Sequence, residues 1–161
     1  MSIKATLNEV LVKLFRNINN IEEQAVKQSS FKDITVNDMH VMEAVGISAP
    51  QNMSTVAKAL MVTTGTLTIS VNGLVKKGYV ERVRSEEDRR VVLVSLTEKG
   101  KKAFRDHQRF HEEMVTAIID KLSVEEQKVL EQALGNLSKF FYERVISNVS
   151  KSEGPQSSKN S

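Results

Sequence analysis

Three arginines gather in one short polar segment near the middle of the chain. Arg84, Arg89 and Arg90 lie within residues 84–90, which separate two β-branched runs. This pattern predicts a β-hairpin with a charged tip. Arginine side chains can enter a narrow minor groove of DNA, where the negative potential is strongest. Asp88 is close enough in sequence to orient the Arg90 guanidinium by a bidentate ion pair. The alternative is a solvated hairpin whose charges only aid solubility.

A second set of candidate residues comes directly before this hairpin. Residues 64–77 have the apolar spacing of a helix, with Leu67, Val71 and Leu74 on one side. The first residues of such a helix can reach base edges in the major groove. Asn72 could hydrogen-bond to adenine, and the methyl groups of Thr and Ile can contact thymine methyl groups. Both contacts favour an A/T-rich site. An ordinary amphipathic helix is the alternative. With the hairpin arginines and Asp88, the predicted DNA-binding residues are Ser54, Thr63, Thr64, Gly65, Thr66, Thr68, Ile69 and Asn72.

The charge distribution supports an anionic partner for this region. The chain has 161 residues and a net charge of +3. Residues 76–109 hold 11 basic and 6 acidic groups, whereas residues 1–75 are neutral and residues 110–148 are acidic. A basic segment between neutral and acidic flanks is the electrostatic pattern of a nucleic-acid-binding surface.

Several classes of protein are excluded by what the sequence does not contain. There is no Cys, which removes disulfides, cysteine nucleophiles and thiolate zinc sites. No nucleotide-binding glycine loop or nucleophile elbow occurs, so we expect no enzyme. No apolar run is long enough for a membrane span, and no signal peptide is evident. We therefore expect a cytoplasmic protein with no membrane partner.

Three histidines form the remaining polar constellation. His107 and His111 are four residues apart on one predicted helix, and His40 lies beside Glu43 on another. Neutral imidazoles at this spacing could bind zinc, which would make the protein a regulator that senses zinc or another small ligand. We favour polar positions at a helix crossing or in a pocket, and therefore predict no metal and no cofactor.

An apolar channel for a flexible ligand is a further possibility. Methionine and phenylalanine side chains at helical spacing could line it, and nearby arginines could meet an acidic partner. Ordinary core packing is the alternative for each residue taken singly. The predicted ligand-binding residues are Phe31, Met39, His40, Met42, Phe104, Arg105, His107, Arg109, Phe110 and Met114.

These residues require a mainly α-helical scaffold. Helices are predicted over residues 3–26, 36–46, 55–60, 64–77 and 98–121, with a last helix from 124 to about 146. Their starts are marked by capping residues: Thr35 with Asp38, Ser54, Thr63, and Ser123 with Glu126. The strands of the hairpin are predicted at 79–83 and 91–95, and residues 50–52 as a turn. Two short helices followed by a hairpin make a winged helix-turn-helix.

The predicted domain organisation has four parts. Residues 1–34 form an N-terminal dimerisation helix, 35–97 the winged helix-turn-helix, 98–149 the C-terminal dimerisation helices, and 150–161 a disordered tail. The first and last helices are too apolar for a monomer with so small a middle, which favours a homodimer with interlocked ends. Such a dimer would place two reading helices about 34 Å apart, one turn of DNA.

The winged segment resembles the MarR transcription regulators. Four motifs occur in the family's order: MSTVAKAL at 53–60, LVKKGYV at 74–80, DRR at 88–90 and LTEKG at 96–100. The resemblance implies a homodimer that binds a pseudo-palindromic operator in double-stranded DNA. In that family the aspartate of the Asp-x-Arg motif orients the second arginine, which corresponds here to Asp88 and Arg90.

A narrower resemblance points to one branch of the family. The segments FKDIT at 31–35, MH at 39–40, RVRSE at 82–86, RFH at 109–111 and MV at 114–115 carry it. That branch represses fatty-acid synthesis genes, with long-chain acyl-acyl carrier protein as corepressor. One departure from the wider family concerns residues 59–75, which contain no charge, so phosphate attraction must come from Lys58, Lys76, Lys77 and the wing.

Overall fold

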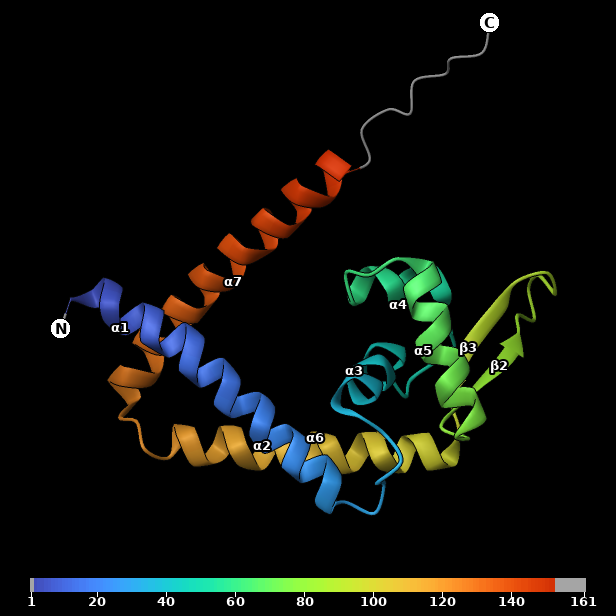
Figure 1. Ribbon diagram of the computed structural model, residues 1–161, viewed down its shortest axis with the longest axis horizontal. Helices are drawn as coiled ribbons and strands as arrows, with labels where there is room; N and C mark the ends of the chain where they lie inside the picture. The colour runs from blue at the N-terminus through green and yellow to red at the C-terminus, as the bar shows by residue number, and fades with distance from the viewer. Residues whose placement is uncertain (1, 153–161) are drawn as a thin grey trace, which may run out of the picture. The chain divides into compact units, whose positions relative to one another are not determined.

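Helices dominate the computed structural model, which describes residues 2–152 (Figure 1). The chain divides into two units, residues 1–112 and 113–161, and α6 spans the division. The mainly α-helical fold with a small winged sheet, predicted from the sequence, is confirmed. The helices are α1 (Ile3–Glu9), α2 (Phe15–Gln28), α3 (Val36–Val45), α4 (Met53–Ala59), α5 (Thr64–Lys76), α6 (Glu98–Ile119) and α7 (Val124–Ser152).

The N-terminal helix differs in detail from the expected single stretch. Between α1 and α2 the chain forms a π-helical turn, η1, over Val10–Leu14. Helix α2 then continues to Gln28, two residues beyond the predicted end. It stops at Ser29, whose extended backbone leaves the helix and whose hydroxyl donates to the Val26 carbonyl at 2.7 Å. Because a π turn takes one more residue than an α turn, it changes the register of the apolar stripe along this helix.

The winged part contains a three-stranded antiparallel sheet in the order β1-β3-β2. Strands β2 (Val80–Arg84) and β3 (Val92–Leu96) begin one residue later than predicted. The prediction of residues 50–52 as a turn was wrong, because β1 (Gln51–Asn52) pairs with β3. Local turn signals do not show that a strand far along the chain has a free edge to pair with.

Three of the predicted helix starts are confirmed. The Thr35 hydroxyl accepts from the Asp38 backbone N–H while the Asp38 carboxylate accepts from Thr35, a complete capping box. Thr63 caps α5 through its hydroxyl. At the start of α7, the Glu126 carboxylate accepts from the Ser123 N–H at 2.8 Å, and the Ser123 hydroxyl accepts in return.

The start of α4 was predicted incorrectly. Asn52, and not Ser54, is the N-cap, since its side-chain oxygen accepts from the Thr55 N–H at 2.7 Å. Ser54 lies inside the first turn and donates its hydroxyl to the same Asn52 oxygen. Asparagine caps a helix as well as serine does, so the choice depended on where β1 ends.

The hydrophobic core lies within residues 1–112. Helix α3 contributes Met39, Met42 and Val45, and α5 contributes its predicted inward face. Tyr79 and Leu96 close the core at the sheet, and Ala103 brings α6 onto it. The other buried apolar members are Val26, Ile34, Val41, Val56, Ala57, Leu67, Val71, Leu74, Val80 and Val94.

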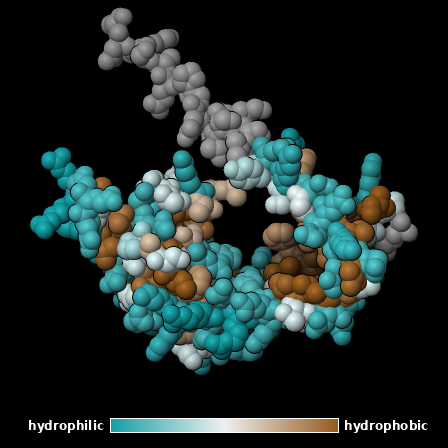
Figure 2. Space-filling model, turned by 180° about the vertical axis from the view of Figure 1, so that it is seen from behind, coloured by the Kyte–Doolittle hydropathy of each residue, from teal (hydrophilic) through white to brown (hydrophobic). Residues whose placement is uncertain are grey.

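Many large apolar side chains stay uncovered in the single chain, and Figure 2 shows hydrophobic patches on the surface. From the N-terminal helix they include Ile3, Val12, Leu14 and Phe15. Helix α7 by itself exposes Val124, Val129, Leu134, Phe140, Phe141 and Tyr142. This helix runs through Ser152, into the segment predicted as a tail, whereas residues 153–161 lie outside the described residues.

Candidate nucleic-acid interface

Helix α5 presents a face without charge on the surface of the winged part. The buried Leu67, Val71 and Leu74 fix its inner side, so the residues between them point outward. Ile69, on this outer face, is 76% exposed. The predicted division into an inner and an outer face is therefore confirmed, and the outer face could contact base edges.

Hydroxyl groups on this face are partly engaged within the helix. The Thr63 and Thr66 hydroxyls lie 2.9 Å apart, and Thr63 also caps the helix. The Thr68 hydroxyl donates to the Thr64 carbonyl at 2.7 Å. Thr63, Thr64 and Thr66 are nevertheless exposed, as are Ser54 and Gly65. The methyl groups of the three threonines can contact an outside partner, whereas the Thr68 hydroxyl hydrogen is already donated to the Thr64 carbonyl.

Asn72 is held by an arginine that the sequence analysis did not select. The Arg82 guanidinium donates to the Asn72 side-chain oxygen at 2.5 Å. Bidentate reading of adenine needs that oxygen as an acceptor. The observed contact therefore argues against adenine reading by Asn72 unless Arg82 moves away. It also ties the base of the wing to α5.

The wing is an ordered turn with a basic surface. Its tip folds around Ser85, whose N–H donates to the Val91 carbonyl at 3.0 Å. The Arg84 guanidinium donates to the Arg89 carbonyl at 3.2 Å. Arg84, Arg89 and Arg90 are all exposed, as expected for groups that would contact phosphate or a groove.

The predicted link between Asp88 and Arg90 takes a different form. The Asp88 carboxylate accepts from the Arg90 backbone N–H at 2.9 Å. The expected bidentate pair with the Arg90 guanidinium is not among the ion pairs of the described residues. Asp88 thus shapes the backbone of the turn, and the Arg90 side chain is left to outside partners.

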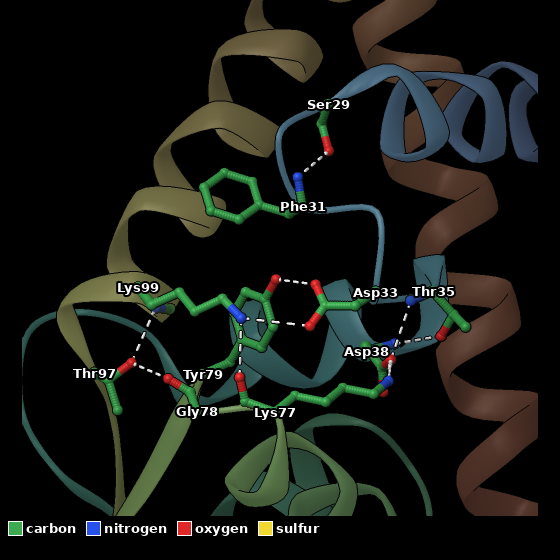
Figure 3. Close-up of polar contacts among 11 residues, drawn as sticks. Ser29, Phe31, Asp33, Thr35, Asp38, Lys77, Gly78, Tyr79, Thr97 and Lys99 are labelled. Atoms are coloured by element: carbon green, nitrogen blue, oxygen red, sulfur yellow. Dashed lines mark hydrogen bonds and ion pairs between the residues drawn. The ribbon is translucent and has the colours of Figure 1, made fainter.

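A polar network anchors the α2–α3 loop to the winged part (Figure 3). Tyr79 donates its hydroxyl to the Asp33 carboxylate at 2.5 Å, and Lys99 lies over the Tyr79 ring at 4.0 Å. The Tyr79 hydrogen bond, with help from Lys99, lowers the pKa of Asp33. Burial, with the neighbouring Asp33, raises the pKa of Tyr79. The network therefore joins the α2–α3 loop to Tyr79, just before β2, and to Lys99 in the first turn of α6.

Lysines beside this network are also engaged. Lys77 donates to the Asp38 carboxylate at 2.9 Å and is therefore less available for DNA phosphate than the sequence suggested. Lys99 donates to the Lys77 carbonyl at 2.9 Å. Of the three lysines predicted to attract phosphate, Lys58 and Lys76 are exposed.

Gly100 explains part of the LTEKG motif. A Cβ placed on Gly100 would lie 2.1 Å from the Tyr79 carbonyl oxygen. That same oxygen accepts from the Thr97 N–H at 3.0 Å. The first turn of α6 thus crosses the start of β2 at a distance that only glycine allows.

The predicted ligand residues fall into separate environments. Phe31, Met39 and His107 line a cavity of about 40 Å³ together with Val26, Ala103 and Asp106. Met42 is instead fully buried in the core, and Phe104 packs against the core. A cavity of this size holds a few water molecules, so a long acyl chain would need it to open. The continuous channel suggested by the sequence is therefore not formed by these residues.

The histidines come together between α2, α3 and α6. His107 is 4% exposed, and its Nε2 lies 3.0 Å from the His111 Nε2. Burial, together with neighbouring His111 and His40, lowers the pKa of His107 to about 4. Two carboxylates face the group, those of Glu22 and Glu43, and burial raises the pKa of Glu43. Phe110 stacks on His107 at a centroid distance of 6.1 Å.

Glu22 is the member of this group that the sequence analysis missed. It is 5% exposed, on the inner side of α2. Its position, four residues after Ile18 and four before Val26, places it on the apolar stripe of the helix. A carboxylate on such a stripe was a signal available from the sequence.

Comparison with known proteins identifies the class that this fold and basic wing define. A family model described as "Transcriptional regulator SarA/Rot" matches residues 24–107. The chain belongs to the MarR/SarA family of winged helix-turn-helix transcriptional regulators, so it is a DNA-binding regulator and not an enzyme. It is similar to FabT of Streptococcus pneumoniae, solved in complex with DNA, with 46% identity and a TM-score of 0.83 over 87% of this chain and 98% of that chain.

More distant similarities agree with this placement. A MarR variant from E. coli has 25% identity and a TM-score of 0.61, over 85% of this chain and 96% of that chain. The regulator SarZ of Staphylococcus saprophyticus is 38% identical over 69 residues, 43% of this chain and 47% of its own length. In the described part of the chain, no helix combines the length and hydrophobicity that a membrane crossing needs.

Proposed function

We propose that this protein is a homodimeric repressor of fatty-acid synthesis genes, with long-chain acyl-acyl carrier protein as its corepressor. The observation that carries this proposal is the 46% identity to FabT, which extends over 87% of the chain and includes regions outside the winged part. Operator DNA lies in the bacterial cytoplasm, which is where we expect the protein to act.

For DNA reading, the proposal assigns different roles to the helix and the wing. Helix α5 would lie in the major groove, where the exposed Ile69 and the threonine methyl groups meet thymine methyls. Arg84, Arg89 and Arg90 would enter or flank the minor groove. An A/T-rich, pseudo-palindromic operator fits both contacts.

The homodimer is supported by what the single chain leaves uncovered. Ile3 is 80% exposed and Phe15 66% exposed, and on α7 Val129 is 69% exposed. Burying apolar surface stabilises a protein by roughly 25 cal/mol per Å², so a second copy covering these side chains would offset the cost of association. Two-fold symmetry would then present two copies of α5 to the two half-sites.

For the corepressor, the proposal requires the cavity beside Phe31 and Met39 to open. Methionine adapts readily to a flexible chain, and the cavity lies at the junction of α2 and the loop that leads to α3. Arg105 and Arg109 are exposed on α6, where they could contact an acidic carrier protein. A ligand that prefers one spacing of the wings by about 1–3 kcal/mol would change operator affinity several-fold to about a hundred-fold.

The test is an operator titration with long-chain acyl-acyl carrier protein and with unacylated carrier protein in parallel. Only the acylated form should tighten operator binding, and the effect should weaken as salt rises. Arg105→Ala should reduce the response, whereas the neighbouring Lys102→Ala serves as the control. Equal responses to the acylated and unacylated carriers would refute the corepressor role and leave DNA binding as the established function.

A further inference from the structure

Five titratable side chains from three helices converge on one point in the first unit. Glu22 comes from α2, His40 and Glu43 from α3, and His107 and His111 from α6. Two groups, Glu22–His107–His111 and His40–Glu43–His107, each have their ligand atoms within 4.8 Å of one another. Both groups share the His107 imidazole, which therefore lies between the other ligands of the two groups.

The separations between these atoms have the scale of a metal coordination shell. The His111 Nε2 lies 3.0 Å from the His107 Nε2 and 3.3 Å from Glu22 Oε1. On the other side, the His107 Nε2 lies 3.4 Å from Glu43 Oε1. Nitrogen and oxygen ligands about 2.0–2.1 Å from zinc in a tetrahedron are about 3.3–3.4 Å from one another. The side chains therefore already stand close to the spacing that a bound ion would impose.

The charges of the cluster also favour the binding of a cation. The Glu22 carboxylate is almost fully buried, and among the described residues its ion-pair partners are the imidazoles of His40 and His111, with no Lys or Arg. A buried carboxylate needs a positive partner to offset its lost hydration. Two imidazole nitrogens that face each other at 3.0 Å likewise need a proton or a metal between them.

We propose that Glu22, His107 and His111 bind one divalent transition-metal ion of the zinc type, with the His40–Glu43 pair completing its coordination. Imidazole and carboxylate ligands without thiolate suit zinc, cobalt and nickel better than magnesium or calcium. The ion joins α2 and α3 to α6, directly next to the cavity that His107 lines. This site adds to the proposed repressor function and does not depend on the fatty-acid or DNA assignments.

The geometry changes the balance between the two interpretations of the histidines. From the sequence, three histidines gave too few ligands for a metal, and polar positions at a helix crossing were the simpler explanation. The structure adds Glu22, a fifth group on a third helix, and brings the ligand atoms of each three-residue group within 4.8 Å of one another. An ordinary helix crossing does not require three imidazoles and two carboxylates in two groups that share His107.

The experiment measures metal binding to the full-length protein after chelator treatment, without DNA. Cobalt is titrated while its visible absorption is recorded, and zinc then competes it off in the presence of a chromophoric chelator. We expect one ion per chain, a cobalt spectrum of low-coordinate type, and no competition by magnesium. His111→Gln and Glu22→Gln should weaken binding at least tenfold, the loss that even an outer-shell change produces.

Matched variants keep the result interpretable. Glu23→Gln changes the adjacent, exposed carboxylate, which pairs with Lys27, and should bind metal as the wild type does. His40→Gln alters an exposed imidazole and should weaken binding with little effect on the fold, which thermal unfolding without metal verifies. Less than one tightly bound ion in the wild type, or equal affinity in His111→Gln and the wild type, would overturn the proposal. Because no DNA is present, failure here is distinct from failure of the repressor assignment.

Discussion

Substituting two helical glycines tests whether the crossing between α6 and β2 is as tight as the structure indicates. In Gly100→Ala the new methyl group would lie 2.1 Å from the Tyr79 carbonyl oxygen and 3.3 Å from the Leu96 Cβ. The oxygen belongs to backbone, so relief requires the helix and the strand to separate. In Gly73→Ala, on α5, the added methyl group meets nothing within 4 Å beyond its chain neighbours and the backbone of its own helix.

The expected effects have opposite signs. Gly73→Ala should raise the free energy of unfolding by about 0.5–1 kcal/mol, because alanine loses less entropy in a helix. Overpacking at Gly100 costs about 1–3 kcal/mol. Straining the hydrogen bond between Thr97 N and Tyr79 O destabilises the fold by about 1 kcal/mol more. The higher helix propensity of alanine stabilises it by about the same amount, so these two effects cancel. The net expectation for Gly100→Ala is a loss of about 1–3 kcal/mol.

Urea unfolding at one fixed protein concentration measures both variants, since the stability of the proposed homodimer would depend on concentration. The midpoint should fall for Gly100→Ala and rise for Gly73→Ala with unchanged slope. If Gly100→Ala is as stable as Gly73→Ala, the close approach of α6 to Tyr79 is not a constraint on the fold, and our explanation of the glycine in the LTEKG motif is wrong.

Three other predictions concern the wing, the loop network and the dimer. Arg90→Ala should weaken operator binding by about 5-fold to 150-fold, as loss of a charged groove contact of about 1–3 kcal/mol would, without changing thermal stability; binding within twofold of wild type counts against a role for this side chain. The pKa of Asp33 is lower in the folded state than its usual 3.8, so its contribution is present above that value and is lost as pH falls through the lower folded pKa. Wild type should therefore exceed Asp33→Asn in urea stability by more at pH 6 than at pH 3, and a constant difference would exclude this linkage. Light scattering at micromolar concentration should give twice the 18.0 kDa chain mass, and a monomer mass would refute the homodimer.

Those parts of the fold that depend on neighbouring residues could be predicted from the sequence. The Thr35–Asp38 capping box and the Thr63 cap formed as expected, because each needs only residues three positions apart. The inner face of α5 was also correct, since helix periodicity alone sets it. The winged helix-turn-helix followed from a chain of such local signals, whereas the MarR assignment followed from the resemblance of four motifs.

Features that depend on distant partners could not be read in this way. Strand β1 exists only because β3 offers it an edge, and its end decides that Asn52 caps α4 in place of Ser54. The Arg82 contact to Asn72 joins residues ten positions apart on different elements. The Asp33–Tyr79 contact spans 46 positions and gave no pattern in the sequence.

The candidate sites were predictable in part for the same reason. Exposure of the wing arginines followed from a polar run between two strands. Asp88 was correctly placed beside Arg90 in the turn, but whether its carboxylate meets a backbone N–H or a guanidinium depends on turn geometry. Met42 satisfied the spacing of a ligand channel, yet spacing cannot separate a pocket from a core, and the structure places it in the core.

The absence of charge between Ala59 and Val75 has a consequence for how selectivity responds to ionic conditions. Binding that displaces counterions from phosphates falls steeply as salt rises, by roughly 0.9 powers of salt concentration per phosphate contact. If α5 reads the operator through methyl groups and hydroxyls, it displaces few counterions itself. The counterions are then displaced mainly by the wing arginines, and this happens on DNA of any sequence. Total affinity would then drop with salt for operator and unrelated DNA in parallel. The ratio of the two affinities, which decides where on a chromosome the protein resides, would stay nearly constant as a cell's ionic strength changes.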